Sequence, residues 1–293
     1  MFGSSAKSTP KKETKSEFEI DEPEDESGLV KSLQINLTRL IAYAESADVY
    51  LQREVAEKLA NEAVKPARQA QIVEFGGLQL LVPLTKSKDI EVQRLAAHAL
   101  ANLSVNADNQ LLMAKEGAIE MLTRLLDGET ELIQRQSAKA LANLGVNSEN
   151  KRKIAEKGAI PKLVRLSAVM QVSVKIEAIA ALANLAVNDQ NELEIVELGG
   201  LVPIVQGLSL AANALNSDSK AGTGASMDQY EELAAQCARA LRNLSVNPNN
   251  KGSIIELGAG SHLQALSFIR NERIAQQARR ALRNLDLDAG AKK

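Results

Sequence analysis

One phrase of eight residues occurs four times in this chain, and its repetition limits the fold more than any other feature. It is written ALANLSVN at residues 99–106, ALANLGVN at 140–147, ALANLAVN at 181–188 and ALRNLSVN at 240–247. The asparagines inside the phrase recur at one constant step through Asn61, Asn102, Asn143 and Asn184, then after one longer step at Asn243, and after the constant step again at Asn284. A fixed period of roughly 40 residues is typical of stacked repeats, in which each unit covers the hydrophobic face of the next.

A second series, of glycines, keeps the same period and breaks at the same place. Gly76, Gly117, Gly158 and Gly199 follow one another at the constant step, and Gly258 comes after the longer one. Both series are lengthened once and by the same amount, so a single insertion must lie between Gly199 and Asn243. The polar, Gly/Ser-rich composition of this stretch predicts an inserted loop at about residues 211–229.

Each unit has the pattern of three helices. A short polar helix ends at a glycine such as Gly117, because glycine adopts the positive φ that ends a helix and turns the chain. A second helix follows, and in one unit Pro161 stands in its opening turn, where proline is tolerated. The third helix is the longest, and its apolar residues recur at steps of three and four: Val92, Leu95, Ala96, Ala99, Leu100 and Leu103. Aromatic residues make up only 2% of the chain and there is no Trp, so Ala and Leu supply the core of an all-α fold.

The pattern EGAIxxLxxLL followed by VQRxAAxALANL, repeated at this period, resembles the armadillo repeat. The resemblance implies an armadillo-type α-solenoid, a right-handed superhelix of three-helix repeats. Five repeats are expected within residues 66–288: 66–106, 107–147, 148–188, 189–247 with the inserted loop, and 248–288. Residues 29–65 align with part of a repeat through Asn61 and are expected to cap the N-terminal end. The C-terminal end is less protected and invites a partner or self-association, and residues 289–293 form a short tail.

Residues 1–28 belong to no repeat. They contain four lysines against eight acidic residues and few large apolar side chains, which predicts a disordered acidic tail. One hypothesis is that the acidic stretch 17–26 occupies the binding groove of its own chain, and the alternative is that the tail only improves solubility.

In armadillo proteins the third helices line the concave face, and the asparagine at this position holds the backbone of an extended peptide. The resemblance implies this role for Asn102, Asn143, Asn184, Asn243 and Asn284. A carboxamide offers both a donor and an acceptor, which is what a peptide unit presents in return. Stacked helices lie roughly 8–10 Å apart and an extended chain advances about 3.3 Å per residue, so the row could meet about every third peptide residue. The alternative is that each asparagine bonds to nearby backbone and fixes the register of the stack.

Basic residues accompany this row and predict the charge of the groove. Four residues before the asparagines, on the same helix face, stand His98, Lys139, Arg239 and Arg280. Further cations lie eight residues before, at Arg94 and Arg135, and immediately before, at Arg242 and Arg283. A basic groove favours an acidic or phosphorylated ligand, because arginine makes charge-assisted bonds to carboxylate and phosphate. The tryptophans with which nuclear-import adaptors of this family hold basic signals are absent. The alternative is that the long cations only cover apolar helix surface.

The sequence shows no pattern of an enzyme. His98 and His262 fall at different repeat positions, Cys237 aligns with small residues and reads as a packing residue, and neither a metal motif nor a phosphate loop is apparent. No cofactor and no metal are expected. A net charge of −2 and a pI near 5.9 do not suggest nucleic acid as a partner.

The expected location is the cytoplasm or the nucleus. The sequence shows neither a secretion signal nor a lipidation motif. It also contains no apolar run long enough to cross a bilayer, so membrane insertion is not expected. A single cysteine fits a reducing compartment.

These patterns predict a non-catalytic scaffold or adaptor that binds an extended, acidic or phosphorylated segment of another protein. The alternative is a structural subunit held permanently in a cytoskeletal, ciliary or other large assembly.

Overall fold

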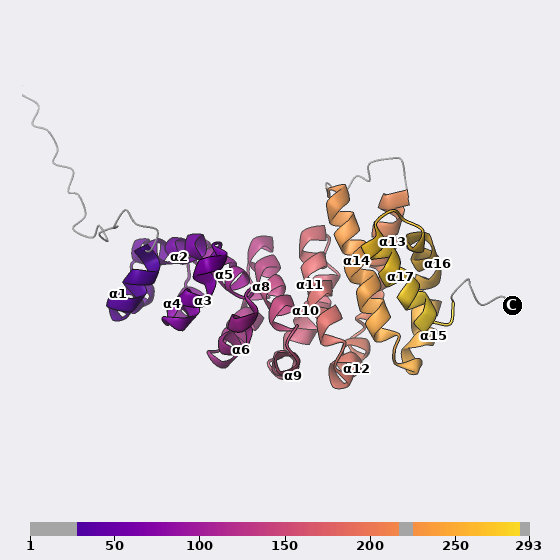
Figure 1. The fold of residues 1–293 in the computed structure, drawn as a ribbon, viewed down its shortest axis with the longest axis horizontal. Coiled ribbons are helices and arrows are strands. Elements are labelled where there is room, and N and C mark those ends of the chain that lie inside the picture. The colour runs from indigo at the N-terminus through magenta and orange to yellow at the C-terminus, as the bar shows by residue number, and fades with distance from the viewer. Residues whose placement is uncertain (1–27, 217–224, 288–293) are drawn as a thin grey trace, which may run out of the picture.

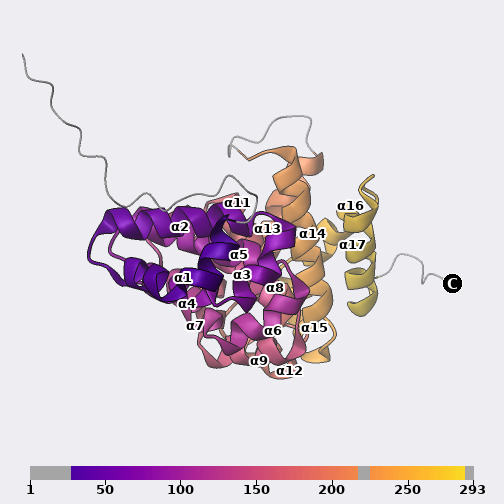
Figure 2. The same cartoon turned by 60° about the vertical axis from the view of Figure 1, so that its left-hand side comes forward.

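The structure is a computed structural model, and it describes residues 28–216 and 225–287. These residues form 17 helices and no strand. The helices are stacked in layers along one long axis, from α1 at one end to α16 and α17 at the other (Figures 1 and 2). The predicted tail at residues 1–28 lies, except for Gly28, outside the described residues, as does the short tail at 289–293.

Each repeat contributes a first, a second and a third helix. The first helices are α3 (Pro66–Glu74), α6 (Ala107–Lys115), α9 (Ser148–Glu156), α12 (Asp189–Glu197) and α15 (Pro248–Glu256). The second helices are α4 (Gly77–Leu84), α7 (Ala118–Leu125), α10 (Ala159–Ser167), α13 (Leu201–Asn216) and α16 (Ala259–Ser267). The third helices are α5 (Ile90–Leu103), α8 (Glu131–Leu144), α11 (Val172–Leu185), α14 (Met227–Leu244) and α17 (Glu272–Asn284).

The glycines separate the first helix from the second, as the sequence predicts. All five have positive φ, from 71° at Gly158 to 85° at Gly117. Such a backbone suits glycine, because a side chain would be strained in it. Pro161 lies in the first turn of α10, where its missing N–H removes no helical hydrogen bond.

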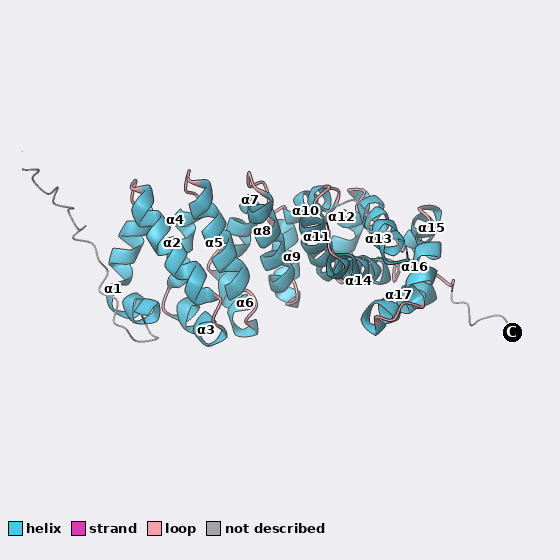
Figure 3. Ribbon diagram, turned by 90° about the horizontal axis from the view of Figure 1, so that it is seen from above, coloured by secondary structure: helices cyan, strands magenta, loops and turns pink. Residues whose placement is uncertain are grey.

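The third helices form the middle of the core. Each packs against the third helices of the repeats before and after it, in the order α2, α5, α8, α11, α14, α17 (Figure 3). The apolar stripe predicted on α5 is buried, and Ala97 and Ala101 beside it are buried too. Because the helix is covered on both sides, small residues are needed where neighbouring backbones approach. The predicted packing role of Cys237 is confirmed, since its side chain is fully buried in α14.

Two further helices precede the repeats. They are α1 (Gly28–Glu45), which is kinked at Asn36, and α2 (Val49–Ala63). The first packs against α2 and α4 and buries Leu29, Leu33 and Leu40 there. Helix α2 packs against α5 in the way that one third helix packs against the next, so it occupies the position of a third helix before the first repeat.

The insertion is more helical than its composition suggests. Residues 211–216 continue α13, and α14 begins at Met227, so the predicted loop bounds of 211–229 are wrong at both ends. Ala211, Ala212 and Ala214 are good helix formers and are buried, which extends the helix into the stretch that reads as a loop. At the other end Ser226 forms a capping box with Gln229 that starts α14. Both helices stand taller than their neighbours in Figure 1.

Candidate functional site

The candidate site is the surface formed by the exposed sides of α2, α5, α8, α11, α14 and α17, here called the third-helix face. Residues at helical steps of three and four share one side of a helix, so each third helix contributes one short column to this face. Because consecutive third helices pack side by side, columns from successive repeats lie next to one another. The structure therefore brings the predicted asparagines and cations onto one continuous surface.

The asparagines on this face join each repeat to the preceding one. Four side-chain amides donate backwards along the stack: Asn143 Nδ2 to Ser104 Oγ at 3.0 Å, Asn184 Nδ2 to Ala142 O at 2.7 Å, Asn243 Nδ2 to Ala183 O at 2.7 Å, and Asn284 Nδ2 to Arg242 O at 2.9 Å. One amide hydrogen of each residue is thus used by the fold. This geometry is what the register-fixing alternative predicts. The second amide hydrogen of each asparagine is left for a ligand. The side-chain oxygens of Asn184 and Asn243 already accept from arginines, so only those of Asn143 and Asn284 have no donor among the described residues.

Asn102 differs from the rest of the row. Its Nδ2 is buried and has no hydrogen-bond partner among the described residues. A buried donor without a partner costs free energy, so this side chain does not help to hold the stack.

The positions four residues before the asparagines do not form a uniform basic stripe. His98 and Lys139 stand at this position in the N-terminal half, and Arg239 and Arg280 stand there in the C-terminal half. Between them lies Ala180, which is buried. The pKa of His98 lies below its usual value, mainly because the ring is partly buried and then because Arg94 and Lys139 are close. A neutral imidazole at neutral pH follows, which reduces the positive charge predicted there.

Arg94 is already neutralised within its own helix. Its Nε and NH2 donate to the two carboxylate oxygens of Glu91 at 2.7 and 2.6 Å, and this bonding holds the pKa of the Glu91 carboxyl below its usual value. Arg135 makes no ion pair among the described residues. Its charge favours a lower pKa of the Glu177 carboxyl in the next repeat, against the larger effect of burial, which raises that pKa. The N-terminal half of the face is therefore less basic than a count of cations suggests.

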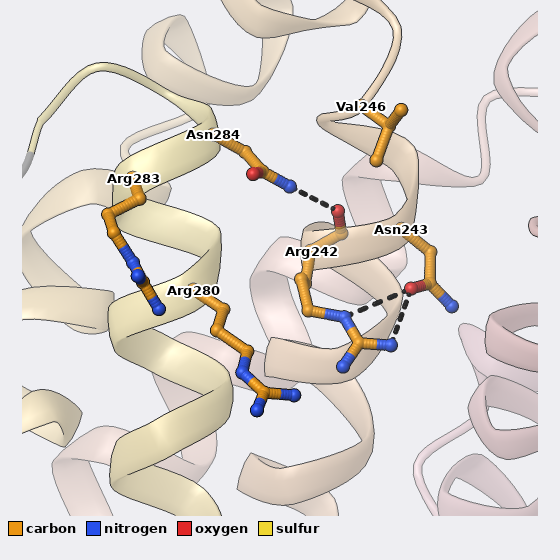
Figure 4. Close-up of a pocket in the computed structure, with 6 residues that line it drawn as sticks. All are labelled: Arg242, Asn243, Val246, Arg280, Arg283 and Asn284. Atoms are coloured by element: carbon orange, nitrogen blue, oxygen red, sulfur yellow. Dashed lines mark hydrogen bonds between the residues drawn. The ribbon is translucent and has the colours of Figure 1, made fainter.

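The C-terminal half of the face contains an open hollow between α14 and α17. Its volume is about 470 Å³, and it is lined by Arg242, Asn243, Val246, Arg280, Arg283 and Asn284 (Figure 4). No carboxylate is among the lining residues. The hollow thus concentrates three guanidinium groups without an acidic side chain, an arrangement suited to an anion.

Arg242 is held in place by neutral groups. Its Nε and NH2 donate to Asn243 Oδ1 at 3.1 and 2.8 Å, and its NH1 donates to Gln277 Oε1 at 2.8 Å. Partial burial, and then the nearby Arg280, lower the pKa of Arg242 from its usual value. The side chains of Arg280 and Arg283 make neither an ion pair nor a hydrogen bond among the described residues, and both residues are exposed. An anion entering the hollow would relieve the repulsion within this cluster.

Arg239 is a structural residue as much as a surface one. Its NH1 donates to Asn184 Oδ1 at 2.8 Å and its NH2 to Ala180 O at 3.1 Å, so it ties α14 to α11. Its Nε is buried without a partner among the described residues. Burial is the main cause that lowers its pKa, followed by repulsion from Arg242 and Arg273.

A second set of asparagines, not among the site residues predicted from the sequence, also joins successive repeats. Asn109, Asn150, Asn191 and Asn250 are buried in the first helices. Three of them donate to a backbone carbonyl of the preceding repeat's first helix: Asn109 to Gln69 O at 2.9 Å, Asn150 to Gln110 O at 3.1 Å and Asn191 to Lys151 O at 3.1 Å. The fourth donates to the Glu192 carboxylate. The recurring VNxxN spacing is the signal that could have found them.

The described residues contain neither a metal-binding cluster nor a single membrane-spanning helix. No group of three or more His, Cys, Asp or Glu side chains among them is placed to hold a metal ion. Within the same residues no single helix is long and apolar enough to cross a membrane. Helices α12 and α13 are together long and apolar enough to cross, but they meet at an angle of 82°.

Solved structures similar to this chain are repeat proteins of the expected kind. An engineered protein matches with 30% identity and a TM-score of 0.71, over 85% of this chain and 98% of that chain. A designed armadillo repeat protein matches with 27% identity and a TM-score of 0.71, over 85% and 99%. Another, solved in complex with the peptide (KR)4, matches with 27% identity and a TM-score of 0.70, over the same shares. A structure from a study of a phosphorylation switch that controls the interaction between cadherin and β-catenin shares 21% identity, and this similarity shows the fold alone.

The sequence itself matches a family model. The armadillo/β-catenin-like repeat matches at residues 66–105, 106–146 and 147–187. A search of curated proteins found no match. The predicted all-α, armadillo-type solenoid is therefore confirmed by the helices, by the repeat matches and by the structural neighbours. The chain belongs to the armadillo repeat family.

Proposed function

We propose that this protein is a non-catalytic scaffold whose third-helix face binds an extended, acidic or phosphorylated segment of a partner protein. Armadillo repeat proteins bind other proteins and peptides, and one designed neighbour was solved with a peptide bound. The observation that carries the acidic preference is the hollow between α14 and α17, which three arginines line without a carboxylate.

The charge of the ligand follows from the charge of this face. The designed neighbour was solved with the peptide (KR)4, whereas a basic peptide would meet Arg242, Arg280 and Arg283 in the hollow of this chain. Like charges at such a contact oppose association, and carboxylate or phosphate oxygens would accept hydrogen bonds from the same guanidinium groups.

The backbone of the ligand has its own contacts. Asn143 and Asn284 use one amide hydrogen for the stack, and their side-chain oxygens accept no hydrogen bond from the described residues. An extended peptide could donate to these oxygens and accept from the remaining amide hydrogens, whatever its side chains are.

The test uses variants that leave the stack intact. Arg239 is unsuitable because its substitution removes two bonds between α14 and α11. Arg280→Gln and Arg283→Gln are suitable because both side chains are exposed and unpaired among the described residues. The matched control is Arg152→Gln on α9, where the arginine side chain is 72% exposed and pairs with Glu156 of its own helix.

Fluorescence anisotropy with a Glu-rich peptide, and with a phosphoserine version of it, supplies the readout. Each single variant should bind about three- to fivefold more weakly and the double variant about tenfold or more, because charge-assisted bonds are lost. Raising the salt concentration should narrow these differences, and Arg152→Gln should bind like the wild type. Unchanged binding of both peptides by the double variant would refute the proposal.

A further inference from the structure

Five exposed valines directly follow the ends of α2, α5, α8, α11 and α14, three residues after Asn61, Asn102, Asn143, Asn184 and Asn243. The members and their exposed fractions are Val64 at 54%, Val105 at 57%, Val146 at 63%, Val187 at 62% and Val246 at 70%. Single exposed apolar residues are ordinary on a protein surface. Four of them stand at the same position of successive repeats and Val64 stands at the equivalent position after α2, and together they are here called the valine row.

The fold does not explain why these residues are valine. The backbone N–H of Val105 donates to Asn102 O at 3.2 Å, and that of Val146 donates to Asn143 O at 3.2 Å. The asparagine that follows each of them, such as Asn106, caps the next helix with its own side chain. Neither contact involves the valine side chain, and more than half of that side chain remains in water.

Along the chain, the valine row follows the asparagines, whereas one set of cations stands four residues before them. His98 lies one helical turn before Asn102, and Val105 lies in the turn that follows the end of α5 at Leu103. Arg239 and Val246 are placed in the same way before and after Asn243, at the end of α14. In the hollow between α14 and α17 the valine, the asparagines and the arginines line one space (Figure 4).

An extended peptide has a matching geometry, since its successive side chains point to opposite sides. If its backbone lies along the asparagines, alternate side chains face the cations and the others face the valine row. We infer that the ligand is a protein segment in which acidic side chains alternate with branched aliphatic ones, the latter packing on the valine row. This inference rests on the proposed function and adds to it an apolar half of the recognition.

The experiment compares two peptides of about 12 residues, long enough to cross three or four repeats. One alternates Glu with Val and the other alternates Glu with Ser, so both carry the same charge. The protein is the full chain, either wild type or with Val105→Thr, Val146→Thr, Val187→Thr and Val246→Thr combined. Threonine has nearly the shape of valine, and the exposed positions keep the core unchanged, which circular dichroism and thermal unfolding verify. Val202→Thr is the matched control, because Val202 is exposed on α13 outside the row.

The wild type and Val202→Thr should bind the Glu–Val peptide at least about tenfold more tightly than the Glu–Ser peptide, because apolar surface is buried against the row. The fourfold threonine variant should lose this preference. Equal affinities for the two peptides in the wild type, or a preference that survives in the threonine variant, would overturn the inference. A wild type that self-associates through the row and shows no peptide preference also overturns it, in favour of a second copy as the occupant.

Failure of the inference and failure of the proposed function are distinguishable. Arg280→Gln combined with Arg283→Gln should weaken both peptides equally, since both present the same carboxylates. If both peptides bind equally well and both depend on these arginines, the acidic preference stands and only the apolar half is refuted. If neither peptide binds the wild type, both proposals are refuted.

Discussion

Arg239 donates from its NH1 to Asn184 Oδ1 at 2.8 Å, and this bond crosses from α14 to α11. The same asparagine donates from Nδ2 to Ala142 O of α8 at 2.7 Å. Asn184 is therefore bonded on both sides, and it links three successive third helices. A ligand that used the Asn184 oxygen would first have to displace Arg239, so we infer that this asparagine serves the stack more than the ligand.

Asn184→Ala should destabilise the protein by about 1–2 kcal/mol, because two bonds between repeats are lost and the Ala142 carbonyl is left without its partner. Asn102→Ala is the matched comparison, since the Asn102 amide nitrogen is buried without a partner among the described residues. Its effect should stay within about 0.5 kcal/mol. Urea denaturation measures both, and equal losses would contradict this view of the row.

Asn109→Ala should cost about 1–3 kcal/mol, because the buried amide donates to Gln69 O at 2.9 Å and to Leu103 O at 3.1 Å. Both carbonyls would lose this donor in a place that water does not reach. Asn249→Ala, at an exposed position of α15, is the control and should change the free energy of unfolding by less than about 0.5 kcal/mol. A loss no larger than that of the control would show that this set of asparagines is dispensable.

The fold could be predicted from local sequence signals that recur in every repeat, whereas the contacts within the site could not. The glycines and the Ala-rich third helices predict the stack because each acts within its own repeat. The link from Arg239 to Asn184 spans 55 residues, so it becomes visible only once the repeats are stacked. The pairing of Arg94 with Glu91 lies within one helix turn, so it could have been predicted from their spacing of three residues. The repeat pattern alone places Arg94 in the basic groove. The predicted start of the inserted loop at residue 211 was wrong, because Ala211 and Ala212 favour helix and are buried.

Gly117→Ala should destabilise by about 1 kcal/mol, although no atom lies within 4 Å of the added methyl group. The cost comes from the backbone alone, since φ is +85° and alanine resists that conformation. Gly252→Ala offers the opposite case, because it also has open space and lies inside α15 without a positive φ. It should stabilise by up to about 1 kcal/mol. Thermal unfolding should move in opposite directions for the two variants, and a shift of the same sign would contradict the explanation.

Glu177→Gln should stabilise the protein at neutral pH by on the order of 1 kcal/mol. Glu177 lies on α11, and its burial raises the pKa of the carboxyl above the usual value of 4.5, with Lys139 and Arg135 acting in the opposite direction. The folded protein thus holds this proton more tightly than the unfolded chain does. Stability therefore falls as pH rises through the window between 4.5 and the raised pKa, and the full penalty is present above that window.

Glutamine carries no charge to bury, so the advantage of Glu177→Gln should disappear as the pH is lowered to about 4. Urea denaturation of both proteins across a pH series measures this difference. Glu149→Gln should have the opposite sign, because a hydrogen bond from Lys153 lowers the pKa of the Glu149 carboxyl, and the variant loses that contact at neutral pH. A difference between wild type and Glu177→Gln that stays constant from acid to neutral pH would mean that burial of this carboxyl does not govern its proton affinity.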